Sequence, residues 1–188
     1  MRILVLDGNE NQAVACVRSL ARAGHSVSVG ADSSWSKAGW SRFSKSSFRY
    51  MPPQTDTASF IENIVKEVGR EQGTLVLPMT ERTTLPLSEE REKIFAAGGR
   101  LVLPPHETVL RAFDKEQTTR LAESLGIAVP QTSLISNRDE ALALASSASY
   151  PLVLKARTSE EITDEGKVRA TGAPVYARSA EELMTGYD

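Results

Sequence analysis

The stretch RILVLDGNEN, residues 2–11, begins with an unbroken apolar run, Ile3 to Leu6, and then becomes abruptly polar. Such a run is typical of a central strand in a parallel sheet, because helices cover that strand on both faces. The polar residues predict a turn, and apolar residues then recur at helical spacing over 13–21. Gly24 marks the end of this helix. We therefore expect a buried strand followed by a helix at the start of the fold.

The same alternation continues along the chain. The run HSVSVG, residues 25–30, predicts a second strand, joined to the first by a right-handed crossover. Residues 32–47 are rich in serine and predict an irregular excursion. Further strands are predicted at 48–53, 74–78 and 98–104, and further helices at 60–68, 88–97 and 114–125. This order predicts an α/β fold with a Rossmann-like open parallel sheet that carries helices on both faces.

The composition is that of an ordinary globular protein, with 40% hydrophobic and 24% charged residues among 188. A net charge of -2 supplies no global field toward nucleic acid or an anionic membrane, so neither is expected as a partner. Cys16 is the only cysteine, which excludes an internal disulfide and a cysteine-based zinc site. No apolar run approaches the length of a signal-peptide core or a membrane span, and we expect a cytoplasmic protein.

The pattern changes after GIAVPQT, residues 126–132. We predict a first domain over 1–125 and a second, α+β domain over 126–188. In the second domain, strands are predicted at 132–136, 150–156 and 172–179, and the pairs Asn137/Glu140 and Ser179/Glu182 have the spacing of capping boxes at helix starts. Because the last of these helices begins only a few residues before the sequence stops, the second domain is expected to be partial.

The segment FDKEQTTRLAESLG, residues 113–126, predicts a helix that starts with a cap and a cation. Asp114 and Gln117 have capping-box spacing, and Lys115 lies in the first turn, where a cation opposes the helix dipole. Lys115 is either a tolerated surface lysine or a residue that binds an anion such as a phosphate together with the start of the helix. The predicted buried face comprises Thr118, Leu121, Ala122 and Leu125.

A second lysine follows a predicted strand in YPLVLKAR, residues 150–157. Leu152, Val153 and Leu154 predict a buried strand, and Lys155 comes directly after it. Burying an unpaired ammonium group is costly. Lys155 therefore either reaches solvent from the strand end or supplies a point charge for a nucleotide phosphate.

Polar residues also follow two strands of the first domain. Asn9 and Glu10 come after the first strand, and Thr80 and Glu81 come after the strand at 74–78. Open α/β sheets bind ligands at the carboxyl ends of their strands, so these residues are candidates for substrate binding. The alternative is that Asn9 and Thr80 cap the helices that follow. No G-x-G-x-x-G motif is present, which argues against a dinucleotide.

The excursion after the second strand mixes aromatic and basic residues. Trp40, Phe43 and Phe48 interleave with four cations: Lys37, Arg42, Lys45 and Arg49. This mixture is typical of platforms for single-stranded nucleic acid. The acidic balance of the chain and the absence of a nucleic-acid-binding motif favour a core-packing excursion with a solvated basic face.

Three motifs occur in a fixed order: DK at Asp114–Lys115, GIAVP at 126–130 and PLVLKA at 151–156. This order resembles the N-terminal half of ATP-grasp enzymes of the carbamoyl-phosphate synthase-like and biotin carboxylase-like kind, in which a DK helix, GIPVP and PLVVKP are typical. The first domain matches these enzymes only in its general alternation of strands and helices, without a specific motif. The resemblance implies that 1–125 is a pre-ATP-grasp domain that helps to bind the carboxylate or amine substrate. It implies that 126–188 is part of the ATP-grasp small subdomain.

The resemblance also implies an ATP-dependent ligase, which activates a carboxylate as an acyl phosphate for attack by an amine or thiol. Lys115 matches the basic residue of the DK helix and Lys155 matches the strand lysine, and both contact ATP phosphates in family members. The implied partners are ATP, Mg²⁺ and a small carboxylate. The chain could also form a homodimer. The implied Mg²⁺ ligands lie beyond Asp188. We therefore assign no catalytic or metal-binding residue here and expect the chain to be inactive alone.

The segment 157–171 departs from the family pattern. The resemblance implies a glycine-rich loop that covers phosphate, whereas here Gly166 stands alone before Gly172. Four acids in this segment would repel a triphosphate: Glu160, Glu161, Asp164 and Glu165. A non-catalytic module that binds a small ligand or a protein on the Rossmann-like domain is the alternative hypothesis.

Overall fold

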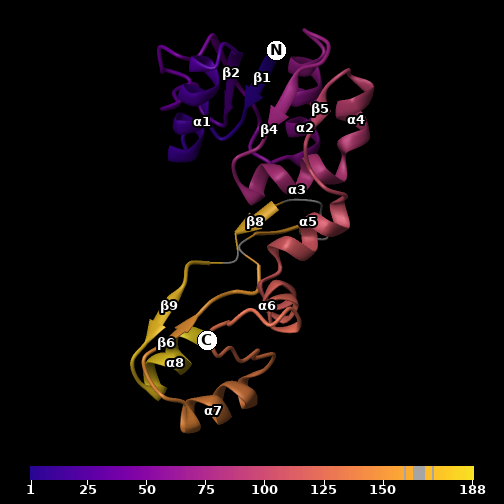
Figure 1. Ribbon diagram of the computed structural model, residues 1–188. Helices are drawn as coiled ribbons and strands as arrows, with labels where there is room; N and C mark the ends of the chain where they lie inside the picture. The colour runs from indigo at the N-terminus through magenta and orange to yellow at the C-terminus, as the bar shows by residue number, and fades with distance from the viewer. Residues whose placement is uncertain (159, 163–167, 171) are drawn as a thin grey trace. The chain divides into compact units, whose positions relative to one another are not determined.

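The computed structural model describes residues 1–158, 160–162, 168–170 and 172–188. The chain forms two compact units (Figure 1). One comprises Met1–Leu110 with the described part of Glu160–Arg169, and the other comprises Arg111–Ser159 with the described part of Ala170–Asp188. The domain boundary predicted after residue 125 stays a prediction.

The first unit is built around a parallel sheet. Its elements are β1 (Arg2–Val5), α1 (Asn11–Arg22), β2 (Ser26–Ala31), β3 (Ser46–Arg49), α2 (Thr57–Val68), β4 (Leu75–Leu77), α3 (Glu81–Glu89), α4 (Arg91–Ala96) and β5 (Arg100–Leu101). The strands lie in the order β3-β2-β1-β4-β5, and every pair is parallel. Ile3 is opposite Val27 on one side and Leu75 on the other. The predicted Rossmann-like α/β fold is therefore confirmed.

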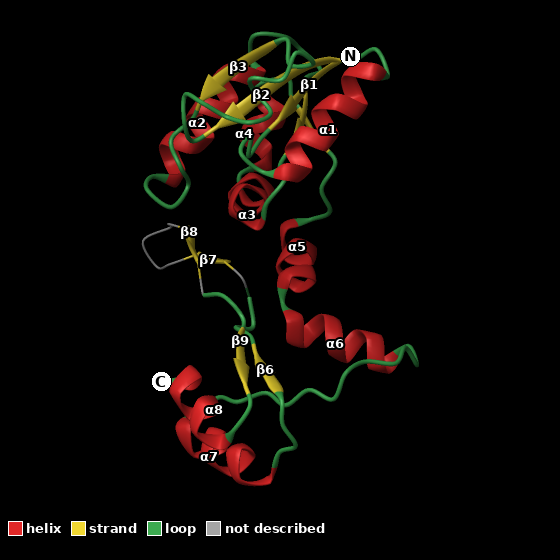
Figure 2. Ribbon diagram, turned by 90° about the vertical axis from the view of Figure 1, so that its left-hand side faces the viewer, coloured by secondary structure: helices red, strands yellow, loops and turns green. Residues whose placement is uncertain are grey.

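The central strand β1 is buried on both faces, as its apolar run predicted. Leu4 and Leu6 pack in one core with residues of α2 and α4, such as Ile64. Ile3 and Val5 pack in a second core with residues of α1. The sheet is thus covered by helices on its two faces, an arrangement visible in Figure 2.

The second unit contains α6 (Lys115–Ser124), α7 (Arg138–Ser147), β6 (Leu152–Leu154), β9 (Val175–Ala177) and α8 (Ala180–Tyr187). The helix α5 (His106–Phe113) includes residues of both units, and β7 (Glu160–Ile162) pairs with β8 (Val168–Ala170). β6 and β9 form an antiparallel pair. Ala141, Ala145, Ala177 and Leu183 form the small core of the second unit, against which Leu152 and Leu154 pack.

Both capping boxes of the second unit formed as predicted. The Asn137 side chain accepts a hydrogen bond from the Glu140 amide at 2.9 Å, and the Glu140 carboxylate accepts one from the Ser136 amide at 2.8 Å. Ser179 accepts a hydrogen bond from the Glu182 amide at 3.2 Å. These side chains satisfy amides that a helix start leaves without a backbone partner.

The helix predicted at 88–97 was wrong in its extent. Two helices, α3 and α4, occupy 81–96, and α5 was not predicted at all. α3 lacks a clear apolar period and contains Pro86, yet its residues Thr83 to Ser88 are buried. Packing in the first unit therefore stabilises a helix that local sequence preferences do not indicate.

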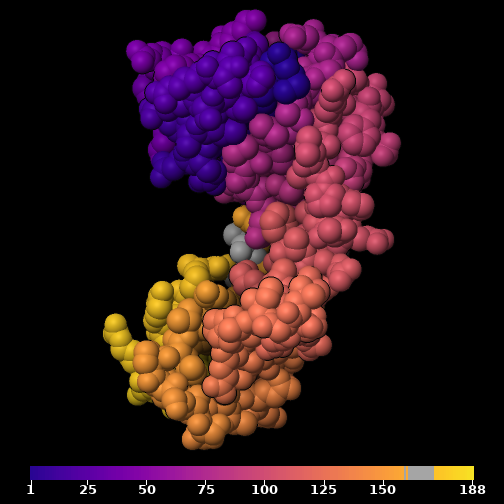
Figure 3. All heavy atoms as spheres, in the orientation of Figure 1, coloured from indigo at the N-terminus to yellow at the C-terminus, as the bar shows by residue number. Residues whose placement is uncertain are grey.

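The strand predicted at 132–136 is absent, since the structure assigns no strand to these residues. Leu134 is exposed there. The predicted buried face of α6 is also wrong, because none of the α6 residues is buried and Leu121 and Leu125 are 53% and 67% exposed. In the space-filling view, α6 lies at the surface of its unit (Figure 3).

The strand β6 is not fully buried either. Leu152 and Leu154 face the small core, whereas Val153 between them is 46% exposed. An apolar run of three residues cannot distinguish a strand covered on both faces from one covered on a single face. β6 belongs to a two-stranded sheet, and that sheet has helices packed on one face.

The excursion between β2 and β3 is irregular, as predicted, but its tryptophans do not pack in a core. Trp35 and Trp40 are 67% and 62% exposed, and their rings stack with centroids 3.9 Å apart. Phe43 and Phe48 do pack against the two cores of the first unit. The core-packing interpretation therefore holds for the phenylalanines and is wrong for the tryptophans.

None of the helices in the described part of the chain combines the length and apolar character needed to cross a bilayer.

Candidate functional site

Asp7 connects the loops at the carboxyl end of the parallel sheet. It follows β1 and has a left-handed backbone, with φ of 56°. Its buried carboxylate accepts hydrogen bonds from the Met79 amide at 2.9 Å, the Thr83 hydroxyl at 2.7 Å and the Tyr50 hydroxyl at 3.2 Å. A residue held in a sparsely populated backbone region costs on the order of 1–3 kcal/mol, and such residues cluster at functional sites. The hydrogen bonds offset this cost.

Tyr50 keeps its proton in this arrangement. Burial is the main cause that raises the pKa of Tyr50 far above its ordinary value, and the negative charge of Asp7 raises it further. The hydroxyl therefore remains a donor to Asp7 over the whole physiological range. The segments after β1, β3 and β4 are thus fixed together at this edge of the sheet.

A shallow hollow of about 20 Å³, open to solvent, lies at the same edge. It is lined by Asp7, Asn9, Glu10, Asp32, Tyr50 and Arg82. Its lining combines carboxylates with a guanidinium group and a hydroxyl group, so groups of both signs of charge face this hollow. The carboxyl edge of an open parallel sheet is where such folds bind ligands.

Two of the four substrate-binding candidates line this hollow. The Asn9 amide donates to the Ser33 hydroxyl at 2.9 Å and to the Asp32 carboxylate at 3.4 Å. Asn9 therefore does not cap α1, and Glu10 occupies the cap position without a side-chain capping bond. The capping interpretation of Asn9 was wrong, and its role in substrate binding stays a prediction.

The other two candidates, Thr80 and Glu81, lie at the start of α3 beside Arg82. Within the described residues, the buried atoms Thr80 Oγ1 and Glu81 Oε2 have no hydrogen-bond partner. Arg82 Nε lies 3.8 Å from Glu160 Oε1. Thr80 and Glu81 do not line the hollow, but they adjoin one of its lining residues, and their role in substrate binding also stays a prediction.

Glu160 is the one acid of the 157–171 segment whose side chain the structure describes. Burial raises the pKa of Glu160, while the Arg82 guanidinium lowers it and the Glu81 carboxylate raises it. Glu160 therefore faces the start of α3. Asp164, Glu165 and Gly166 lie outside the described residues.

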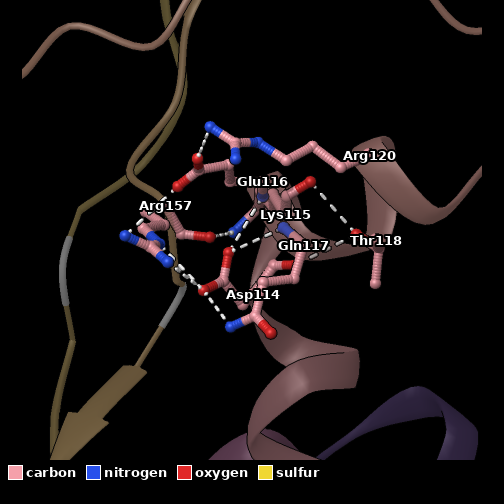
Figure 4. A network of polar contacts seen from close by, with 7 residues as sticks. All are labelled: Asp114, Lys115, Glu116, Gln117, Thr118, Arg120 and Arg157. Carbon is pink, nitrogen blue, oxygen red and sulfur yellow. Dashed lines mark hydrogen bonds and ion pairs between the residues drawn. The ribbon is translucent and has the colours of Figure 1, made fainter. Parts of the chain in front are cut away.

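Arg157 and Asp114 form the main polar contact of the second unit (Figure 4). Arg157 Nε and Nη2 lie 2.8 and 2.6 Å from the same oxygen, Oδ2, of Asp114. Asp114 also caps α6, because its Oδ1 accepts hydrogen bonds from the amides of Glu116 and Gln117. The hydrogen bond from Arg157 is the largest cause that holds the pKa of Asp114 well below its ordinary value. The capping role predicted for Asp114 is confirmed.

The N-terminal amides of α6 are already occupied. The Lys115 amide donates to the Arg157 carbonyl at 3.0 Å, and the next two amides donate to Asp114. Lys115 Nζ lies 3.5 Å from the same Arg157 carbonyl. A phosphate at this position would therefore meet the ammonium group of Lys115 rather than a ring of unpaired amides.

Lys155 is exposed and follows β6 directly. It precedes Arg157 by two residues, so their Cα atoms are at most about 7 Å apart. The structure thus brings the segment that carries Lys155 to the helix start that carries Lys115. The sequence analysis did not predict a role for Arg157. The pattern that could have indicated it is an arginine shortly after a strand lysine, combined with an aspartate at the cap of a distant helix.

Among the side chains that the structure describes, no group of three or more His, Cys, Asp or Glu residues is arranged to hold a metal ion.

No family model matches the chain. The carbamoyl phosphate synthase large chain of Thermus thermophilus is 29% identical to this chain in a match that covers 62% of this chain and 12% of the relative. The L-amino acid ligase from Bacillus licheniformis has a TM-score of 0.63 at 16% identity, over 98% of this chain and 41% of that one. The biotin carboxylase domain of Hydrogenobacter thermophilus 2-oxoglutarate carboxylase, solved with MgADP, ADP and bicarbonate, has a TM-score of 0.58 at 18% identity, over 99% and 39%.

The chain has the fold of the N-terminal portion of an ATP-grasp enzyme. It spans about one eighth of the curated relative and about two fifths of the two solved structures. The ATP-grasp resemblance drawn from the motifs is therefore supported by sequence and by fold.

Proposed function

We propose that this chain is the N-terminal part of an ATP-dependent ligase that activates a small carboxylate as an acyl phosphate for attack by an amine or thiol. Lys115 and Lys155 hold ATP phosphates, and Asn9, Glu10, Thr80 and Glu81 contribute to the substrate site. Mg²⁺ bound with the ATP would neutralise phosphate charge, and the described side chains of this chain contain no group of His, Cys, Asp or Glu residues arranged to hold it. The reaction takes place in the cytoplasm.

One observation carries this proposal. The Arg157 carbonyl lies 3.0 Å from the Lys115 amide and 3.5 Å from Lys115 Nζ, and Arg157 is two residues from Lys155. Two lysines from distant parts of the sequence are thus carried by adjoining segments. A pair of lysines of this kind serves as point charges for a polyphosphate.

The test is isothermal titration calorimetry with ATP and Mg²⁺, on this chain and on the natural protein as its gene encodes it. We expect Lys115→Ala and Lys155→Ala each to weaken ATP binding by about tenfold or more, because each removes a charge-assisted contact worth about 1.5–3 kcal/mol. Lys66→Ala, at an exposed position of α2, is the matched control and should bind like the wild type. Unchanged affinity in both lysine variants would contradict the assignment.

The alternative, a non-catalytic binding module, has one observation in its favour. The hollow at the sheet edge is formed within the first unit alone, from a residue of α3 and from the segments that follow β1, β2 and β3. Binding of a small ligand there by a natural full-length protein that does not bind ATP would favour this alternative.

A further inference from the structure

The start of α6 is fixed by polar contacts. None of its residues is buried, so apolar packing contributes little to its position. Arg157 supplies several of the contacts that the structure describes at this start, beside the capping bonds of Asp114. Its guanidinium group pairs with Asp114 and with Glu116, whose Oε2 lies 3.2 Å from Arg157 Nη1. Its carbonyl accepts the Lys115 amide.

These contacts fall on both sides of Lys115 in the sequence. The side chain of Arg157 binds the residue before Lys115 and the residue after it, and the main chain of Arg157 binds Lys115 itself (Figure 4). Glu116 is in turn paired with Arg120, at 2.5 Å, one turn further along the helix. Any displacement of α6 relative to the segment after β6 would break several of these bonds together.

We propose that Arg157 is a positioning residue, which holds Lys115 at the segment that carries Lys155 and so preorganises the pair of lysines for a polyphosphate. This inference rests on the proposed function of the two lysines. Arg157 acts through Asp114 and the Lys115 main chain, and its own guanidinium remains on the two carboxylates. In such an anion site the two lysines are held in position before the nucleotide binds. Binding then loses less conformational entropy.

The experiment compares ATP affinity in substituted forms of the natural full-length protein, by calorimetry at constant ionic strength. Arg157→Gln removes the charge and keeps the main-chain carbonyl, and we expect the dissociation constant for ATP to rise about tenfold. Arg157→Lys restores the charge without the planar fork and should recover affinity in part. Arg120→Gln is the matched control: it removes an arginine that also pairs with Glu116, and should leave affinity unchanged.

Asp114→Asn separates positioning from direct phosphate contact. Asn is as good a helix cap as Asp, so the helix start is retained while the ion pair with Arg157 is lost. A positioning role predicts weaker ATP binding in Asp114→Asn, and a smaller effect of Arg157→Gln in that background than in the wild type, because only its contact with Glu116 then remains to be lost. If Arg157 binds phosphate itself, Asp114→Asn should release it and strengthen binding, which would overturn the proposal.

Coupling to the lysines provides the second readout. In the Arg157→Gln background, Lys115→Ala should lose most of its effect on ATP affinity, whereas Lys155→Ala should keep its effect. If Arg157 has a purely structural role, Arg157→Gln should reduce the effects of Lys115→Ala and Lys155→Ala on ATP affinity equally. That result would count against the inference. If the lysine variants weaken ATP binding but Arg157→Gln behaves like Arg120→Gln, the inference fails and the proposed function stands. If the lysine variants have no effect, the proposed function itself fails.

Discussion

Two nitrogens of Arg157, Nε at 2.8 Å and Nη2 at 2.6 Å, converge on a single oxygen of Asp114, a residue 43 positions earlier in the chain. Asp114 is buried, and Arg157 is about half exposed. The contact joins a helix cap to the segment after a strand. We therefore expect it to affect both the stability of the second unit in acid and the position of Lys115.

Acid should weaken this contact. The pKa of Asp114 is lower in the folded chain than in the unfolded chain, chiefly because Arg157 donates to it. Its ionised form therefore contributes stability that is complete above about pH 4 and is lost as the pH falls through the folded-state pKa. We expect the free energy of unfolding to fall more steeply in the wild type than in Arg157→Gln between about pH 4 and pH 2. Urea unfolding at a series of pH values measures this, and parallel curves would contradict it.

Asp7 should be critical for stability, although it is a polar residue at a loop. Asp7→Ala removes the acceptor of the Met79 amide and the Tyr50 hydroxyl and the nearer acceptor of the Thr83 hydroxyl, and it places alanine at positive φ. We expect a loss of about 2–4 kcal/mol in the free energy of unfolding. The control is Asp32→Ala, an exposed acid of the same hollow, which should stay within about 0.5 kcal/mol of the wild type. Equal effects in urea unfolding would refute this distinction.

The two helical faces predicted to be buried should respond very differently to truncation. Ile64 of α2 is fully buried, and Ile64→Ala should cost about 2–5 kcal/mol through lost contacts and the cavity left behind. Leu121 of α6 is 53% exposed, and Leu121→Ala should change the free energy of unfolding by less than about 0.5 kcal/mol. Chemical denaturation of this chain checks both, and a cost at Leu121 similar to that at Ile64 would show that its face is covered.

The stacked tryptophans should be accessible to quenchers. Trp35 and Trp40 are the two tryptophans of the chain and are largely exposed, and the same excursion carries four cations. We expect iodide to quench their fluorescence more strongly than caesium does, because the local positive charge attracts an anion. High salt should reduce the difference, since it screens exposed charges. Weak quenching by both ions would mean that the rings are covered.

Much of the first unit follows from its sequence. The apolar run at Ile3 to Leu6 predicted a central strand, because only a strand covered on both faces can lack polar residues. α3 was less predictable, since it is stabilised by its burial in the first unit and its sequence contains a proline. Leu121 shows the opposite limit. A helical period of apolar residues indicates that a face can be buried, but it does not say whether a partner is present.

The candidate site was predictable in part. Capping-box spacing identified Asp114 as a helix cap, and the structure confirms it. The motifs proposed Lys115 and Lys155 as phosphate-binding residues, and that role stays a prediction. Arg157 was not identified, because a contact over 43 positions depends on how a strand and a helix meet. Asp7 was missed for a similar reason. Its three donors come from three separate segments, and no local pattern relates them.

The strand order has a consequence for synthesis of the protein. β1 is made first, yet one of its two neighbours in the sheet is β4, with Ile3 opposite Leu75. During translation the first strand therefore has one edge without its partner until the residues of β4 have left the ribosome. Pairings between distant residues form slowly, because the intervening chain must be ordered first. β1 thus cannot complete its pairing until a nascent chain several times its own length has been made. Until β4 pairs with it, the open edge of β1 is exposed to aggregation or chaperone binding.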